Sequence, residues 1–224
     1  EQLGGPSVPL LDPDTCRDLP GFSAFYSDHM AAVIDLRGDG AHRYLAKNNH
    51  LLGRLSLLQR IFPNAVLLVP FRSPLQHAAS LRNQHARFIN IHRDDPFALR
   101  YMRFVGHDEF GTEARLTAFA PGSPALPGDD LAGWLRYWIN AYTHVLQADV
   151  PVTFISYERL CLQPEGQLAS ILRTANLDPS AAVTAGASRI SAGSPHEIDT
   201  SELSDELLQR ANALHAKLLQ RALV

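Results

Sequence analysis

The feature that most constrains the fold is a continuous apolar run, Ala65–Phe71 (AVLLVPF), which an arginine and then Ser73 and Pro74 follow directly. The run is short and contains two valines, which is typical of a strand buried within a parallel sheet. Pro70 predicts that the ladder frays near the end of this strand, because proline has no N–H to donate. Ser73 and Pro74 predict the N-cap and the first turn of a helix that runs to about His85.

The segments on either side predict an alternation of strands and helices. A strand that ends in polar groups is predicted at Arg43–Asn48, a leucine-rich helix at Leu51–Phe62 and a second buried strand at Pro151–Ser156. Further helices are predicted at Leu131–Gln147, Pro164–Ala175 and Glu202–Leu223, while residues 1–40 are predicted to form loops around a short helix. This order predicts one α/β domain over residues 1–224, built on a parallel sheet.

Charge is distributed unevenly along the chain. With 20 Lys and Arg against 23 Asp and Glu, the formal net charge is -3, which argues against bulk association with nucleic acid or an acidic membrane. The stretch Ala41–Arg93 nevertheless contains eight Lys or Arg, five His and no Asp or Glu. The remainder therefore carries 12 basic and 23 acidic residues, or -11. This local excess predicts that the basic stretch meets an anion.

Cysteine usage and hydropathy point to the cytoplasm. Cys16 and Cys161 can form one disulfide at most, and neither a disulfide framework nor a zinc cluster is evident, so no metal is expected. No run of 18 apolar residues predicts an integral membrane segment, and the N-terminus has no secretory layout. Because residue 1 is Glu and not Met, we expect the chain to be processed or truncated at its front.

Arg72 is the first candidate for binding the anion. It follows a buried strand directly, and ligands of open α/β sheets bind outside the carboxyl ends of the strands. Its planar guanidinium can bind two phosphate oxygens, and the N-terminus of the next helix adds N–H donors. Ser80 lies eight residues on, about two turns into that helix. The alternative is that Arg72 forms a surface ion pair and Ser80 is a small packing residue.

A second polar cluster, Lys47-Asn48-Asn49-His50, stands at the predicted end of the preceding strand. It offers a cation, amide donors and a possible general base near the same sheet edge. The alternative is a polar turn from strand to helix in which Asn49 is the N-cap. Both interpretations can hold together.

These segments resemble the sulfotransferases that use 3′-phosphoadenosine 5′-phosphosulfate (PAPS), most closely their bacterial members. The block FRSPLQHAAS is similar to the family's strand, Arg-x-Pro and helix with a serine eight residues after the arginine. KNNH stands where cytosolic members have a Lys-Thr-His strand end, and FISYERLCLQPEGQL resembles their strand, Tyr-Glu-x-Leu and Pro-initiated helix. The likeness covers residues 43–86 and 152–175. It implies a three-layer fold like that of P-loop NTPases, with a mostly parallel sheet flanked by helices.

The resemblance also implies a reaction and a set of site residues. PAPS would be the co-substrate, no metal would be needed, and the sulfuryl group would pass to a hydroxyl or amine of an acceptor that the sequence does not identify. The residues implied to bind the nucleotide are Arg72 and Ser80 at the 3′-phosphate, Tyr157 near the adenine and Arg189 in a C-terminal loop. Lys47 would stabilise the bridging oxygen, and His50 is the nearest base for the acceptor proton.

The chain departs from the family pattern in two places. In the family, a first strand leads into a Ser/Thr/Gly-rich loop that binds the 5′-phosphosulfate, and no such pair is evident here. Two Gly-containing segments are candidates for the loop, but Gly4–Ser7 has no strand before it and Arg37–Gly40 contains an acidic residue. We therefore expect the first strand and loop to be missing from this chain. The family's catalytic His aligns with Asn49, which leaves His50 one residue out of register. The alternative function is a non-catalytic module that binds a nucleotide or another anion.

Two further patterns have competing interpretations. Gly106–Phe110 brings an imidazole and two carboxylates together, which suits acid/base work or acceptor binding, but a solvated loop is the simpler interpretation. Trp134, Trp138 and Tyr142 form a stripe at helical spacing, which predicts a core face rather than an aromatic platform for an acceptor. The acceptor is instead expected to meet variable loops around Asn90–Gly128.

Overall fold

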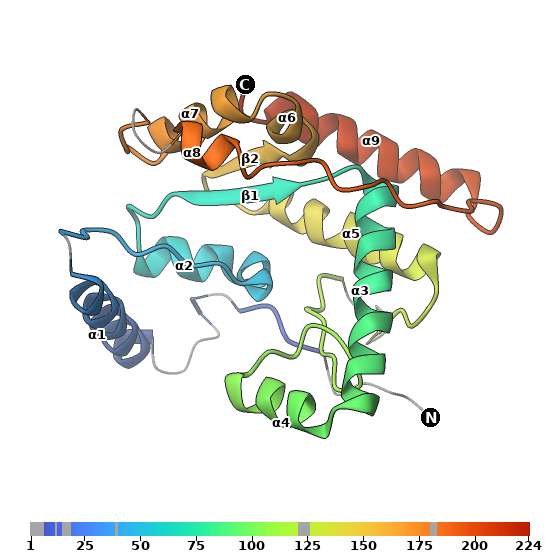
Figure 1. The fold of residues 1–224 in the computed structure, drawn as a ribbon, viewed down its shortest axis with the longest axis horizontal. Coiled ribbons are helices and arrows are strands. Elements are labelled where there is room, and N and C mark those ends of the chain that lie inside the picture. The colour runs from blue at the N-terminus through green and yellow to red at the C-terminus, as the bar shows by residue number, and fades with distance from the viewer. Residues whose placement is uncertain (1–6, 12, 15–18, 39, 121–125, 180–182) are drawn as a thin grey trace.

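A computed structural model of the 224-residue chain describes residues 7–11, 13–14, 19–38, 40–120, 126–179 and 183–224 (Figure 1). Within these residues the fold is mixed α/β and mostly helical. The helical elements, in chain order, are α1 (Leu19–Arg37), the 3-10 helix η1 (Asn49–Arg54), α2 (Leu55–Ile61), α3 (Pro74–Asp94), α4 (Pro96–Val105), α5 (Leu131–Gln147), α6 (Tyr157–Leu162), α7 (Pro164–Thr174), α8 (Val183–Ala187) and α9 (Asp205–Arg221).

Two parallel strands, β1 (Leu67–Phe71) and β2 (Val152–Ser156), form the sheet of the described part of the chain. Leu67 pairs with Val152, and Phe71 pairs with Ser156. Both buried strands that the apolar runs predict are therefore confirmed. Because the strands are parallel and end together, the residues that follow Phe71 and Ser156 emerge side by side.

Pro70 does not fray the ladder as predicted, since it pairs with Ile155 and the pairing continues to Phe71. The carbonyl of Pro70 accepts a hydrogen bond from the Tyr142 hydroxyl at 2.7 Å. In an extended strand the N–H and C=O of one residue point to the same side. The missing N–H of Pro70 thus falls on the side away from β2, where a strand tolerates proline.

The core lies between the sheet and the helices α5, α3 and α9. Trp134, Trp138 and Tyr142 are almost fully buried, so the stripe on α5 is a core face as predicted. The α9 face contributes Leu207, Ala211, Leu214 and Leu218 to the same core. Phe71 packs edge-on against Tyr142 of α5 and His215 of α9, which joins the strand to both helices.

Three parts of the predicted fold need correction. Arg43–Asn48 is an irregular segment and not a strand: its arginine side chain binds the carbonyls of Ala175 and Asn176 at the end of α7, and its Leu45 is exposed. The helix in the first 40 residues, α1, is a long one of 19 residues. The described sheet has two strands, so the three-layer arrangement with a larger sheet is not seen in this part of the chain.

The region expected to provide variable loops, residues 90–128, contains the unpredicted helix α4. Asp95 is its N-cap and accepts a hydrogen bond from the N–H of Phe97 at 2.9 Å, with Pro96 in the first turn. Gly106 ends it with a φ of 65°, a left-handed conformation that glycine adopts without strain. The Asp-Pro pair and the glycine could therefore have indicated the two ends of this helix in the sequence. Among the described helices, none is long and apolar enough to cross a membrane.

Candidate anion-binding site

The ends of β1 and β2 bring two of the sequence-predicted residues together. Arg72 follows β1 and Tyr157 follows β2, and the paired strands end at the same level. The guanidinium carbon Cζ of Arg72 lies 5.0 Å from the centroid of the Tyr157 ring, which is a cation–π contact. A cation and an aromatic face therefore stand next to each other at the edge where open α/β sheets bind ligands.

Arg72 keeps hydrogen-bonding capacity at this edge. Its Nη2 lies 3.4 Å from Oε1 of Gln76, one turn into α3. Its side chain is half-buried, and none of the ion pairs within the described residues involves it. The simple surface ion pair considered above is thus not observed in that part of the chain. A guanidinium without an ion-pair partner among these residues suits an anion.

The segment between α8 and α9 covers the ends of both strands. The N–H of Gly193 donates to the Tyr157 hydroxyl at 3.1 Å. The Gln76 amide makes two hydrogen bonds to the main chain of His196: its Nε2 donates to the carbonyl at 3.0 Å, and its Oε1 accepts from the N–H at 2.8 Å. Figure 1 shows this orange-red segment crossing the end of β1 and the first turns of α3.

Ser80 and Arg189 stand at the margin of this site. Ser80 is half-buried and lies one turn beyond Gln76 on the same face of α3, between Gln76 and Asn83. Asn83 approaches the Nδ1 of His196 at 3.4 Å, so the serine lies on the face that the covering segment crosses. Arg189 is exposed at the start of that segment, and no hydrogen bond among the described residues joins its side chain to Arg72.

A carboxylate already occupies the N-terminus of α3. Glu158 accepts the N–H of Ser73 at 2.8 Å through Oε1, and the hydroxyl of Ser156 at 3.3 Å through Oε2. Ser73 is the N-cap as predicted, but its own side chain makes no cap hydrogen bond. An anion at this edge would therefore depend on Arg72 and not on the first free N–H of the helix.

Sequence reasoning missed the residues that complete this site: Gln76, Glu158, Gly193 and His196. Gln76 and Glu158 carried usable signals, because one lies at i+4 from Arg72 and the other adjoins Tyr157 in the Tyr-Glu pair. The covering segment was indicated only by the resemblance, which implied a C-terminal loop with Arg189 at the nucleotide. Its contacts to Gln76 and Tyr157 run through its main chain, so no residue type indicates them.

The structure places Lys47 and His50 apart from this group of contacts. Lys47 is exposed in the irregular segment before η1. Asn48, and not Asn49, is the N-cap, because its side chain accepts the N–H of His50 at 2.8 Å. His50 uses both ring nitrogens, with Nδ1 3.1 Å from the Thr117 hydroxyl and Nε2 3.2 Å from Oδ1 of Asp108. A histidine held on both sides in this way acts as a structural tether, and the geometry gives no support to its predicted role as a base.

The acidic loop Gly106–Phe110 is more enclosed than a solvated loop would be. Glu109 is buried and lies 2.8 Å from the Nδ1 of His107. Asp108 joins His50 to Arg115, whose Nη1 lies 3.5 Å from the second carboxylate oxygen. These pairs tie the loop to η1, so the carboxylates hold structure rather than forming an open acid/base site.

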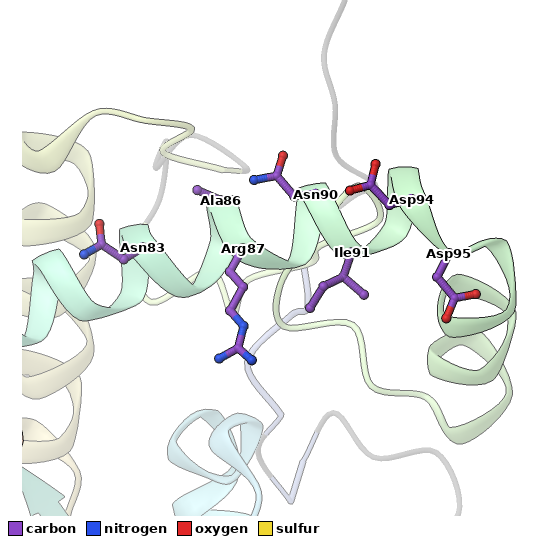
Figure 2. Close-up of a pocket in the computed structure, with 7 residues that line it drawn as sticks. All are labelled: Asn83, Ala86, Arg87, Asn90, Ile91, Asp94 and Asp95. Carbon is purple, nitrogen blue, oxygen red and sulfur yellow. The ribbon is translucent and has the colours of Figure 1, made fainter.

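A separate hollow runs along α3, away from the strand ends. Figure 2 shows the residues that line it, which are Asn83, Ala86, Arg87, Asn90, Ile91, Asp94 and Asp95. None of the sequence-predicted site residues lines it. In the close-up Arg87 extends to one side of the helix, while Asn90 and Asp94 lie on the other, so the charges do not converge on one point.

Comparison with known proteins adds no relative, since no protein-family model, curated protein or solved structure matches the chain. Within the described residues no group of three or more His, Cys, Asp or Glu side chains is placed to hold a metal ion. The features that indicate a function are therefore the geometry at the strand ends and the residue patterns that resemble sulfotransferases.

Proposed function

We propose that the chain binds a 3′-phosphorylated adenosine nucleotide at the ends of β1 and β2, as the donor site of a PAPS-dependent sulfotransferase. The observation that carries the proposal is the stacking of Arg72 on Tyr157 beneath the segment that holds Gly193. The bacterial sulfotransferase pattern anticipates an arginine after one strand and a tyrosine after another at a shared nucleotide site.

The chemistry of these side chains fits such a nucleotide. The guanidinium of Arg72 can make two parallel hydrogen bonds to phosphate oxygens, and Ser80 adds a hydroxyl one turn beyond Gln76. Tyr157 offers a ring face for an adenine, which stacks on aromatic side chains. Arg189, at the start of the covering segment, adds positive charge if that segment closes further over a bound nucleotide.

In the proposed reaction an acceptor oxygen or nitrogen forms the new bond to sulfur while the bond from sulfur to the 5′-phosphate oxygen breaks. The products are the sulfated acceptor, adenosine 3′,5′-bisphosphate and the proton that the acceptor hydroxyl or amine releases. As in phosphoryl transfer, positioning and stabilisation of the leaving charge dominate such a step. Lys47 is our candidate for stabilising the leaving oxygen. We assign no base, because His50 is held by Thr117 and Asp108.

The finer features of fold and compartment belong to this proposal. A parallel pair such as β1 and β2 is part of the three-layer, P-loop-NTPase-like fold of sulfotransferases. A cytoplasmic location agrees with Cys161, which is a free thiol; Cys16 lies outside the described residues.

A non-catalytic nucleotide-binding module is the second candidate. The observation in its favour is that no Gly/Ser/Thr-rich loop follows either strand within the described residues, where the family would cradle the 5′-phosphosulfate. The two candidates share the site at Arg72 and Tyr157. They differ in whether PAPS is turned over.

Titration calorimetry with adenosine 3′,5′-bisphosphate and with 5′-AMP tests the shared site. We expect the bisphosphate to bind at least tenfold more tightly, because only it carries a 3′-phosphate. Arg72→Ala should remove 10- to 100-fold of that affinity, as expected for loss of a charge-assisted hydrogen bond worth about 1.5–3 kcal/mol. Arg72→Lys should recover part of it. Equal affinities for the two nucleotides would overturn the proposal.

A turnover assay separates the two candidates. The chain is incubated with PAPS and a panel of hydroxyl and amine acceptors, and release of adenosine 3′,5′-bisphosphate is followed. Acceptor-dependent release that Arg72→Ala reduces supports a sulfotransferase. Tight binding of the bisphosphate without any release supports the binding module.

A further inference from the structure

A largely apolar cavity lies along the edge of β1 that does not face β2. Its volume is about 370 Å³, and its walls come from residues 66–70, the neighbouring 3-10 helix and α2, and the inner face of α5. Leucine and valine side chains form much of the wall, together with the aromatic residues Trp134, Tyr137, Trp138 and Tyr142. A space of this kind suits a small apolar molecule.

Apart from Oε2 of Glu109, which lies 2.8 Å from Nδ1 of His107, two polar atoms in this wall have no hydrogen-bond partner within the described residues. One is Nδ1 of His77 on α3, and the other is Nε1 of Trp138 on α5; both atoms are buried. Their rings flank the same side chain, because the Tyr142 ring lies 6.2 Å from the His77 ring and 4.8 Å from the Trp138 ring. Buried polar atoms are nearly always paired, so two unpaired atoms beside one cavity point to a missing partner.

The chemistry of these atoms defines that partner. The indole N–H can only donate, while the imidazole nitrogen accepts or donates according to its tautomer. A hydroxyl group can pair with either atom, since it accepts from an N–H and donates to an unprotonated imidazole nitrogen. Burial and the nearby charge of Arg72 lower the pKa of His77 to about 4, which keeps the ring neutral and suited to an uncharged ligand.

We propose that this cavity binds a mostly apolar small molecule that carries a hydroxyl group, with the hydroxyl hydrogen-bonded to the unpaired Nδ1 of His77. The binding follows from the cavity itself, and only the role of the bound molecule as the sulfuryl acceptor rests on the proposed function. Lys47, our candidate for the leaving oxygen, lines the same cavity. An acceptor held there would have its polar end among the few polar groups of the wall.

The test compares two probes of nearly equal shape, 2-naphthol and 2-methylnaphthalene, by calorimetry with the compound in the cell and the protein in the syringe. We expect 2-naphthol to bind about tenfold more tightly, because only its hydroxyl can pair with His77. His77→Leu should remove this preference by lowering the affinity for 2-naphthol much more than that for 2-methylnaphthalene. His215→Leu is the matched control, since His215 is also partly buried and packs on Trp138 but does not line the cavity.

A second variant keeps the proposal testable if His77→Leu does not fold. Ala141 is buried in the cavity wall, so Ala141→Phe should fill the space and abolish binding of both probes. The proposal is overturned if the wild-type chain binds neither probe, or binds both equally and Ala141→Phe has no effect. Binding of 2-naphthol without binding of adenosine 3′,5′-bisphosphate would support the cavity and reject the proposed function.

Discussion

The guanidinium of Arg72 lies over the ring of Tyr157, with 5.0 Å between Cζ and the ring centroid. The two residues are far apart in the chain but follow paired strands that end together. The Tyr157 ring holds the Arg72 guanidinium at the strand ends, where its Nη2 contacts Gln76. This pair is the structural centre of the proposed nucleotide site.

The first prediction separates the ring of Tyr157 from its hydroxyl. Tyr157→Ala should weaken binding of adenosine 3′,5′-bisphosphate three- to tenfold, because it removes both the cation–π contact and the surface for adenine stacking. Tyr157→Phe keeps the ring and loses only the acceptor for the Gly193 N–H, so its affinity should fall less than threefold. Titration calorimetry measures both. Equal losses in the two variants would mean that the hydroxyl, and not the ring, carries the effect.

The second prediction concerns the tether between Gln76 and His196. Gln76→Leu removes both hydrogen bonds to the main chain of residue 196, so the covering segment should open more often. Hydrogen exchange measured by mass spectrometry should speed up across residues 190–198 and stay unchanged in α5. Gln84→Leu on the same helix is the control, and faster exchange in that variant too would point to a general weakening of α3.

The elements that sequence predicted well are those whose pattern reflects burial alone. Leu67–Phe71 and Val152–Ser156 are short apolar runs, and Leu131–Gln147 has its aromatic stripe at helical spacing. Each pattern is therefore buried by one kind of element only, a strand or a helix. Arg43–Asn48 alternates like a strand, but what holds it is the contact of its arginine with α7. A tertiary contact of this kind leaves no trace in local periodicity.

The candidate site was predictable to a similar extent. The position of Arg72 after a predicted strand placed it at the sheet edge, and the resemblance implied Tyr157 for the same nucleotide. The structure brings the two residues together. The link from Gln76 to residue 196 spans 120 residues and uses main-chain atoms, so no residue type signals it. The contacts of His50 escaped the sequence for a related reason, because its partners Thr117 and Asp108 come from a distant loop.

The third prediction concerns Glu158, whose carboxylate caps Ser73 beside the proposed phosphate site. Glu158→Gln keeps the shape of the side chain but removes a negative charge, so the affinity for adenosine 3′,5′-bisphosphate should rise about two- to fivefold. The gain should shrink at high salt, because the carboxylate is exposed and its field is screened. Calorimetry at two salt concentrations checks this. Glu165→Gln makes the same charge change on α7 and should leave the affinity unaltered.

The fourth prediction tests the structural role of His50. Thr117→Val preserves shape and removes the hydroxyl 3.1 Å from Nδ1 of His50, which should cost about 1–2 kcal/mol in the free energy of unfolding. Asp108→Asn, at a more exposed partner, should cost about 1 kcal/mol or less. Urea titration measures both losses. Nucleotide affinity should not change in either variant, and a large change would place this cluster at the nucleotide site after all.

The fifth prediction is a dependence of stability on pH that arises at His77. Burial, with a smaller contribution from Arg72, lowers the pKa of this histidine from 6.5 to about 4, while Glu158 opposes the shift. Between these two values the unfolded chain takes up a proton that the folded chain refuses, so stability falls as the pH drops from 6.5 towards 4. A shift of this size corresponds to at most about 3 kcal/mol. Burial also lowers the pKa values of His85, His144 and His215, which steepens the fall in the wild-type chain.

His77→Leu isolates that contribution. Its free energy of unfolding, measured by urea titration at pH 7 and at pH 4.5, should fall less between the two pH values than that of the wild-type chain, because leucine binds no proton in either state. The same substitution at the exposed His42 controls for the loss of a histidine as such and should leave the pH dependence as in the wild type. If His77→Leu and the wild-type chain lose equal stability on acidification, the imidazole is not kept neutral by burial, and its suitability as a partner for an uncharged hydroxyl is lost with it.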